Sequence, residues 1–114
     1  MKILTFLIFI LISFQLLGQT KSYHQGTQSY QLHLHQNLWV SEDCLKECLA
    51  LKTPQLKRAS NLIHAGNPAA EFCKSAQGKY LVVKDPTGLA EGLCQFSDGS
   101  YILAWDYFKK FKNK

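Results

Sequence analysis

Apolar residues follow a helical period in the segment that begins at Asn67. They fall at i, i+3, i+4 and i+7, which is one face of an α-helix: Ala69, Phe72, Cys73 and Ala76. Asn67 can accept backbone N–H bonds as the N-cap, and Pro68 stands at the first helical position, where its missing N–H costs nothing. Gly78 would supply the left-handed residue that ends the helix. The pattern therefore predicts a helix from Pro68 to just before Gly78.

Three short strands with turn signals between them are predicted after this helix, over residues 80–83, 89–96 and 101–103. The sequence Asp85-Pro86-Thr87-Gly88 has the residues of a type I turn, with Gly88 at its fourth position. Asp98-Gly99 is typical of a two-residue hairpin turn. The second strand would place small and apolar residues on one face: Ala90, Gly92, Cys94 and Phe96.

Beyond the third strand the pattern becomes helical again, with Ala104, Phe108 and Phe111 on one side and Trp105 beside them. Residues 65–114 therefore predict a small domain composed of a helix, a three-stranded antiparallel meander and a short C-terminal helix. This is an α+β arrangement.

The preceding chain has weaker patterns. Residues 19–31 are polar and show no apolar period, so we expect a flexible tail. Leu32 and Leu34 alternate with His33 and His35, which predicts a short strand before residue 40. Residues 41–64 predict a helical segment: Ser41 precedes a helix over 42–52, and a second short helix follows over 55–65. The expected fold class is thus α+β with one or two N-terminal helices.

Residues 1–18 have the pattern of a secretory signal peptide, because a single Lys at position 2 precedes an apolar run that ends at Gly18. A retained membrane anchor is the alternative, but the run of about fifteen residues is short for a span. Residue 19 is Gln and not the Cys that carries a lipid, so we expect an exported protein that is not lipidated, in the periplasm or outside the cell. The mature chain would carry 12 basic and 8 acidic residues, a net charge of +4. This charge permits contact with anionic surfaces, while no nucleic-acid motif is present.

Four cysteines in a short exported chain are typical of disulfides. Cys73 lies on the apolar helix face and Cys94 on the strand face that carries Phe96, so we expect a bond between them, with two buried free thiols as the alternative. Cys44 and Cys48 share a helix face. They could bond to each other with distortion of the helix, pair with Cys73 and Cys94 in a crossed arrangement, or reach another chain.

The C-terminal half resembles a known family. The residues that carry the resemblance are Asn67-Pro68-Ala69, Cys73, Gly88, the series Gly92-x-Cys94-x-Phe96-x-Asp98-Gly99-Ser100, then Trp105 and Phe108. This order and spacing, over residues 65–111, are similar to those of a small secreted bacterial domain of unknown biochemical function that commonly carries a hemolysin label. The resemblance implies the fold of the C-terminal domain, and it names no substrate, cofactor or partner. Members of the family often have a second cysteine pair at positions that Ile102 and Lys112 occupy here.

No catalytic set is recognisable, so we predict that the chain is not an enzyme. Asn67, Asp85 and Asp98 are explained as cap and turn residues, and Glu71 stabilises a first helical turn. His33 and His35, with His24 nearby, could bind Zn²⁺ or Cu²⁺ only with a third ligand that the sequence does not identify. We therefore predict neither a metal site nor a cofactor.

Three functions remain compatible with these features. The first is an exported, disulfide-stabilised binding module for an extracytoplasmic protein or a wall component, with Lys84, Glu91 and Gln95 on its contact face. The second is a membrane-active protein that uses a basic aromatic C-terminus: Lys109, Lys110, Phe111 and Lys112. In a simpler interpretation of that segment, Trp105 and Phe108 fill the core. The third is a proteinase inhibitor that presents the Asp85–Gly88 turn or the Asp98-Gly99 loop.

Overall fold

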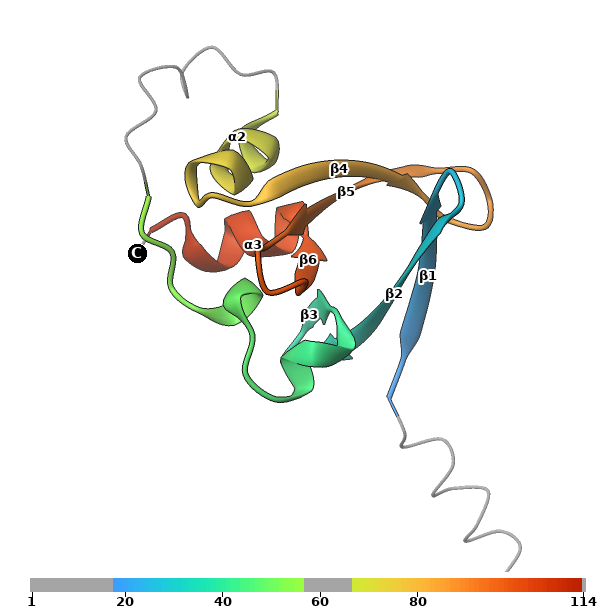
Figure 1. Cartoon of the computed structure of the whole chain (residues 1–114), viewed down its shortest axis with the longest axis horizontal. Helices are drawn as coiled ribbons and strands as arrows, with labels where there is room; N and C mark the ends of the chain where they lie inside the picture. Colours follow the sequence, from blue (N-terminus) through green and yellow to red (C-terminus); the bar gives the residue numbers. More distant parts are fainter. Residues whose placement is uncertain (1–17, 57–66, 114) are drawn as a thin grey trace, which may run out of the picture.

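The computed structural model describes residues 18–56 and 67–113 of the 114-residue chain, and the six strands in these ranges close into an antiparallel barrel (Figure 1). The strands are β1 (Thr20–Gln25), β2 (Gln28–His35), β3 (Leu38–Val40), β4 (Lys79–Lys84), β5 (Ala90–Gln95) and β6 (Tyr101–Leu103). Their order around the barrel is β1-β2-β3-β6-β5-β4. The helices are α2 (Pro68–Ser75) and α3 (Ala104–Phe111), and two 3₁₀ turns, η1 (Glu42–Leu45) and η2 (Leu49–Leu51), follow β3.

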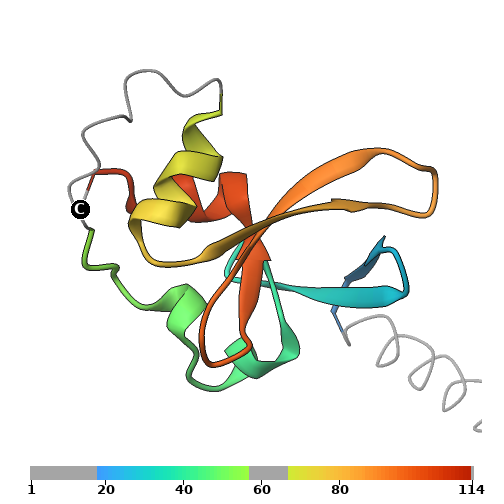
Figure 2. The same ribbon diagram turned by 45° about the horizontal axis from the view of Figure 1, so that its top comes forward.

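The barrel consists of two three-stranded meanders, β1–β2–β3 and β4–β5–β6. Strand β3 pairs with β6 at Val40 and Ile102, and β1 pairs with β4 at His24 and Lys84. Each junction is short, whereas β1–β2 and β4–β5 are joined over six residue pairs each. The turns of the two long hairpins lie on the same side of the molecule, where β1 meets β4 at His24 and Lys84, and α2 and α3 lie at the other end of the β4–β5 hairpin (Figures 1 and 2).

The strands separate two apolar clusters. One fills the barrel with side chains from the strands: Tyr23, Leu32, Leu81, Val83, Leu93 and Leu103. The other lies between the outer face of the sheet, the helices and the 3₁₀ turns, and it includes Phe72, Phe96, Ile102, Tyr107 and Phe111. Neighbouring residues of a strand point to opposite faces, so Leu93 lies inside the barrel and Cys94 outside it.

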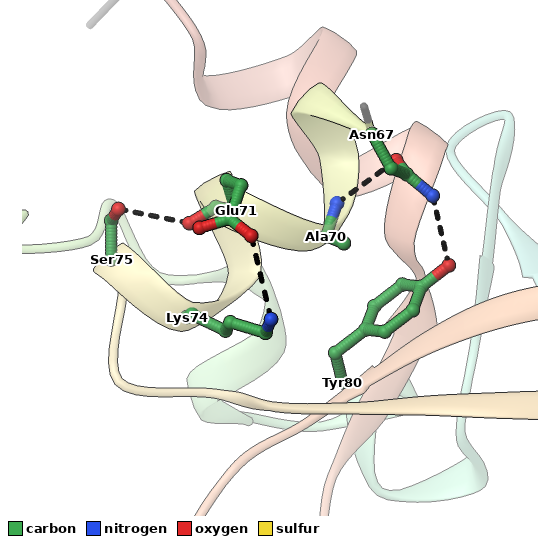
Figure 3. A network of polar contacts seen from close by, with 6 residues as sticks. All are labelled: Asn67, Ala70, Glu71, Lys74, Ser75 and Tyr80. Atoms are coloured by element: carbon green, nitrogen blue, oxygen red, sulfur yellow. Dashed lines mark hydrogen bonds and ion pairs between the residues drawn. The ribbon is translucent and has the colours of Figure 1, made fainter. Parts of the chain in front are cut away.

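The N-terminus of α2 has the predicted cap. The Asn67 Oδ1 atom accepts the Ala70 N–H at 3.1 Å, and Pro68 occupies the first turn. The Asn67 amide also donates to the Tyr80 hydroxyl at 3.1 Å and so links α2 to β4 (Figure 3). The Tyr80 ring covers Gly92, where any Cβ atom would collide with it. Gly92 therefore permits the close packing of Tyr80 on the sheet.

The C-terminus of α2 differs from the prediction. Gln77, with φ of 67°, and not Gly78, takes the left-handed conformation. Its N–H donates to the Lys74 carbonyl at 3.0 Å while the Gly78 N–H donates to the Cys73 carbonyl at 2.9 Å, which is the Schellman pattern. Gly78 is required for space instead, because a Cβ atom there would collide with the Cys94 Sγ and lie 2.9 Å from the Cys73 Sγ.

The predicted α+β fold class is wrong. The helix Pro68–Ser75, the three strands and the C-terminal helix exist, but the strands form one half of a closed six-stranded barrel. Residues 20–35, expected to be mostly a flexible tail, form the β1–β2 hairpin. Gly26, with φ of 59°, occupies the first position of its two-residue turn, and Gln36 and Asn37, both with positive φ, form the β2–β3 turn.

The helix predicted over 42–52 is also wrong. Cys48, with φ of −150°, is extended and separates η1 from η2. Ser41 makes no side-chain cap; its hydroxyl accepts the Tyr101 N–H at 3.0 Å. In place of a regular helix, this segment forms the two 3₁₀ turns and contains the Cys44–Cys48 disulfide. Residues 1–17 and 57–66, which include the predicted signal peptide and most of the second helix, lie outside the described residues.

Two details of the C-terminal half need correction. The loop after β5 has three residues, 97–99, because the Gly99 N–H donates to the Phe96 carbonyl and the Phe96 N–H donates to the Ser100 carbonyl, each at 2.9 Å. In α3 the buried residues are Ala104, Tyr107 and Phe111, and Trp105 is 44% exposed. Trp105 therefore does not fill the core, and the buried Phe111 is not available for membrane contact.

Candidate binding groove

Both cysteine pairs are bonded. Cys73 and Cys94, 5.7 Å apart between Cα atoms, join α2 to β5 as predicted. Cys44 and Cys48, 4.9 Å apart, bond to each other, which was one of the open alternatives. The described residues contain no free cysteine. All four half-cystines are buried, so the bonds stabilise the fold and offer no exposed redox centre.

The Asp98–Ser100 loop is a docking point for the N-terminal half. The Asp98 Oδ2 atom accepts the Leu49 N–H at 2.8 Å, and the Ser100 hydroxyl accepts the Ala50 N–H at 3.1 Å. These two acceptors satisfy the free N–H groups at the start of η2. Burial alone would raise the pKa of Asp98, but the hydrogen bonds from Ser100 and Leu49 outweigh it and lower that pKa. Asp98 thus has a structural role, because it holds η2 against the loop between β5 and β6.

A groove lies between the start of β1 and the turn that joins β4 to β5. We call it the barrel-mouth groove, and its volume is about 560 Å³. One wall is the start of β1, with Thr20, Lys21, Ser22 and Tyr23. The other wall comprises Asp85, Pro86, Leu89, Ala90 and Glu91.

The charges of the groove are held in place by local contacts. The Asp85 Oδ1 atom accepts the Thr87 hydroxyl at 2.6 Å and the Leu89 N–H at 2.9 Å, and hydrogen bonding to Thr87 lowers the pKa of this carboxyl. Burial, with a smaller contribution from the Glu91 and Asp85 charges, raises the pKa of Tyr23. Lys21 places its ammonium group 4.4 Å from the centre of the Trp39 ring. The carboxylates of Asp85 and Glu91 therefore lie on one wall of the groove, whereas the ammonium group of Lys21, from the other wall, is directed to Trp39.

Apolar surface completes the groove. Leu89 is 68% exposed, the largest exposed fraction among the described large apolar side chains. Ser22, Tyr23 and Pro86 also line an adjoining hollow of about 470 Å³, which Tyr30 and Tyr101 border. The aromatic rings of Tyr30 and Tyr101 meet edge to face with centroids 5.3 Å apart. The two hollows together make this side of the barrel uneven and partly apolar.

The contact face predicted from the sequence does not exist as one surface. Lys84 pairs with Ala90, and Glu91 pairs with Val83. Because adjacent residues alternate between faces, Lys84 and Glu91 lie on opposite faces of the hairpin. Gln95 lies at the far end of β5, opposite Lys79 and Tyr101. Of the three, only Glu91 lines the groove.

The C-terminal segment presents a second surface. Trp105, Phe108, Lys109 and Lys112 fall at i, i+3, i+4 and i+7 of α3 and its C-cap. The Trp105 and Phe108 rings are 5.7 Å apart, and the Lys112 ammonium group is 5.5 Å from the Phe108 ring. Lys110 lies instead near Phe111. This surface carries one exposed aromatic ring, Trp105, at the end that precedes the lysines.

Of the described histidines, His24 lines the hollow beside the groove, and His33 and His35 lie apart from both surfaces. His33 and His35 are half-buried on one face of β2, and His24 belongs to β1. Among the described residues, no group of three or more His, Cys, Asp or Glu side chains is placed to hold a metal ion. In the same part of the chain, no helix has the length and apolar character needed to span a bilayer.

The groove residues of β1 were missed because they lay in the predicted tail. The signal that could have identified them is Gly26-Thr27, a turn dipeptide flanked by Tyr23 and Tyr30.

No curated protein and no solved structure matches the chain significantly. Residues 64–110 match the family model described as "Domain of unknown function (DUF333)", which covers α2, β4, β5, β6 and most of α3 and leaves β1, β2 and β3 outside the match.

Proposed function

We propose that this chain is an exported, non-catalytic binding module that contacts its partner through the barrel-mouth groove. The observation that carries the proposal is the position of Leu89, which is 68% exposed on the wall that also holds Asp85 and Glu91. Contiguous apolar surface beside unpaired charge is typical of interaction sites. In the described residues, the only ion pair is Lys74–Glu71, so neither Asp85 nor Glu91 is neutralised by a neighbouring cation there.

The non-catalytic part of the proposal is supported by the roles of the polar side chains. Asn67 caps α2, Asp85 closes the β4–β5 turn, and Asp98 docks η2. A general base or nucleophile needs a free side chain aligned with a reacting group. These three residues are occupied by hydrogen bonds within the fold.

Export is supported by the two disulfides, because such bonds persist in oxidising compartments. The partner we propose is accordingly an extracytoplasmic protein or a wall component. Nothing in this choice requires catalysis or a cofactor.

Site-specific photo-crosslinking in the exporting cell tests the proposal. A photoreactive amino acid at position 89 should give a discrete cross-linked species. The matched control is position 45, because Leu45 is also exposed, at 52%, but lies in η1 and outside the groove. The same species from both positions, or none from position 89, would contradict the proposal.

A second candidate is adhesion to an anionic membrane, as the hemolysin label of the resembling family would suggest. It is favoured by the exposed Trp105, which shares one face of α3 and its C-cap with the exposed Lys109 and Lys112. Trp105→Ala and Lys109→Gln/Lys112→Gln should each reduce sedimentation with vesicles that contain anionic lipid, whereas Leu45→Ala should not. Equal sedimentation of all variants would remove this candidate.

A further inference from the structure

The free edge of β1 follows from the hydrogen-bond pattern of the first hairpin. The Leu34 N–H donates to the Gln19 carbonyl at 3.0 Å, and the β1–β2 register pairs Lys21 with Leu32. In an antiparallel pair, every second residue directs its backbone groups to the partner strand. Lys21 and Tyr23 follow Gln19 by two and four residues, so their backbone N–H and C=O groups point to β2. Thr20 and Ser22 direct their N–H and C=O groups to the opposite edge.

That opposite edge is the one that faces β4, and little covers it. The register contains a single β1–β4 pair, His24 with Lys84. One further contact, from the Gln25 side-chain amide to the Val82 carbonyl at 3.1 Å, lies on the far side of this pair. From His24 back to Thr20, the strand diverges from β4 and forms the wall of the barrel-mouth groove. Thr20 and Ser22 thus present an unpaired strand edge to the groove.

The opposite wall does not complete the pairing. Pro86 has no N–H to donate. The Asp85 N–H donates to the Leu89 carbonyl at 2.9 Å, and the Gly88 N–H donates to the Asp85 carbonyl at 3.0 Å, so these backbone groups are used within the turn. This wall can contact a ligand only through side chains, which are the exposed Leu89 and the carboxylates of Asp85 and Glu91.

We propose that the groove binds an extended peptide segment of a partner protein, which adds as a strand to the free edge of β1 and places a basic side chain beside Glu91 and Asp85. Strand addition supplies main-chain hydrogen bonds, and the side chains along the groove supply selectivity. Leu89 contacts an apolar side chain of the segment. The proposal deepens the proposed function and rests on it, since it names the chemistry of the partner at the same groove.

A defined peptide tests this chemistry. The probe is a blocked hexapeptide, Thr-Val-Arg-Val-Thr-Val, which in an extended form places arginine on one face and the valines on the other. It is titrated into the oxidised protein and followed by amide NMR. The signals of Thr20 and Ser22 should shift, and their hydrogen exchange should slow at least about fivefold because the groups become paired. Two control peptides carry glutamate for arginine or methyl groups on the backbone nitrogens.

Variants of the protein separate backbone pairing from side-chain contact. Ser22→Pro removes an N–H that points into the groove and keeps the β1–β2 hydrogen bonds, so binding should weaken about tenfold. Ser22→Ala keeps the N–H and should bind as the unmodified protein does. Glu91→Gln should weaken binding of the arginine peptide about two- to fivefold, and it should not weaken binding of the glutamate peptide.

The outcomes distinguish the inference from the proposed function. No shift of Thr20 and Ser22 at millimolar peptide, or equal binding of the N-methylated peptide, overturns strand addition. If position 89 nevertheless gives its cross-linked species in cells, the groove remains a contact surface for a partner of other chemistry. If both experiments fail, the proposed function fails with the inference.

Discussion

The hydroxyl group of Tyr101 takes the place of a strand partner for Gln31. It accepts the Gln31 N–H at 3.2 Å and donates to the Gln31 carbonyl at 3.1 Å. Strand β3 is only three residues long, and its last residue, Val40, pairs with His33. Gln31 lies beyond the end of β3 and has no partner residue there. The Tyr101 side chain of β6 therefore supplies the two hydrogen bonds that a longer β3 would make with Gln31.

Tyr101→Phe should therefore loosen the middle of β2 without changing the packing of the ring on Tyr30. Loss of both hydrogen bonds at a half-buried site should lower the free energy of unfolding by about 1–2 kcal/mol. Urea unfolding measures this loss, and exchange of the Gln31 amide should accelerate.

Tyr30→Phe is the control for this measurement, because among the described residues the Tyr30 hydroxyl makes no hydrogen bond while its ring packs against Tyr101. It should change the free energy of unfolding by less than about 0.5 kcal/mol. Equal losses in the two variants would show that the bridge to Gln31 contributes nothing.

The elements of the C-terminal half could be predicted because their local signals agree with their surroundings. Asn67 and Pro68 cap α2 as the pattern indicates, and the predicted Asp85–Gly88 turn forms, with the Gly88 N–H donating to the Asp85 carbonyl. The strand Tyr101–Leu103 has its predicted bounds. In each case the residues that decide the structure are neighbours in sequence.

The N-terminal half was misjudged because only one face of its hairpin is apolar. Tyr23 and Leu32 point into the barrel, while the residues between them in sequence, apart from the half-buried Tyr30, face solvent and are mostly Ser, Thr, Gln and His. Such a composition is typical of a tail when the partner strands are unknown. The interior of the barrel, to which β4, β5 and β6 contribute, supplies the apolar surroundings that the local sequence lacks.

The groove lay beyond sequence reasoning for a related reason. Its walls, residues 20–23 and 85–91, meet through a single strand pair between His24 and Lys84. No local pattern encodes a pairing across 60 residues of chain. The contact face expected around Lys84 and Glu91 overlooked the register of the hairpin, in which Lys84 pairs with Ala90 and Glu91 pairs with Val83, so that the two side chains lie on opposite faces.

The two disulfides should differ in their contribution to stability. Cys73–Cys94 closes 21 residues and Cys44–Cys48 closes 4, so the loop-entropy relation assigns them about 3 and about 2 kcal/mol. Cys73→Ala/Cys94→Ala should thus lower the urea midpoint more than Cys44→Ala/Cys48→Ala. The opposite order would mean that contacts of the 44–48 loop, and not loop entropy, dominate.

Alkaline solution should destabilise the fold through Tyr107. Burial raises the pKa of its phenol above the usual 10.0, so the native state keeps the proton after the unfolded chain has lost it. Stability is then unaffected below pH 10 and falls as the pH rises above 10. Tyr107→Phe should reduce this fall by about 1.4 kcal/mol per pH unit, measured by urea unfolding at pH 9, 10 and 11. Identical slopes in the two proteins would contradict the assignment.

Acid should act through Asp98, which joins the loop between β5 and β6 to η2. Its pKa lies below the usual 3.8, so its contribution is complete above that pH and is lost as the pH falls toward the lower native value. Asp98→Asn should destabilise the protein by about 1 kcal/mol at pH 7, because one amide oxygen cannot serve both Ser100 and Leu49. The variant should also lose less stability than the unmodified protein between pH 4 and pH 2.

Amide exchange locates this acid effect. In Asp98→Asn the Leu49 N–H should exchange faster because it loses its carboxylate acceptor. The Ala50 N–H should also exchange faster, because its acceptor, the Ser100 hydroxyl, loses the carboxylate to which it donates. Asp43→Asn is the matched control, because Asp43 is an exposed carboxylate of η1 whose side chain accepts no hydrogen bond from the described residues. If both variants lose stability equally in acid, general charge repulsion and not the Asp98–Leu49 contact governs unfolding at low pH.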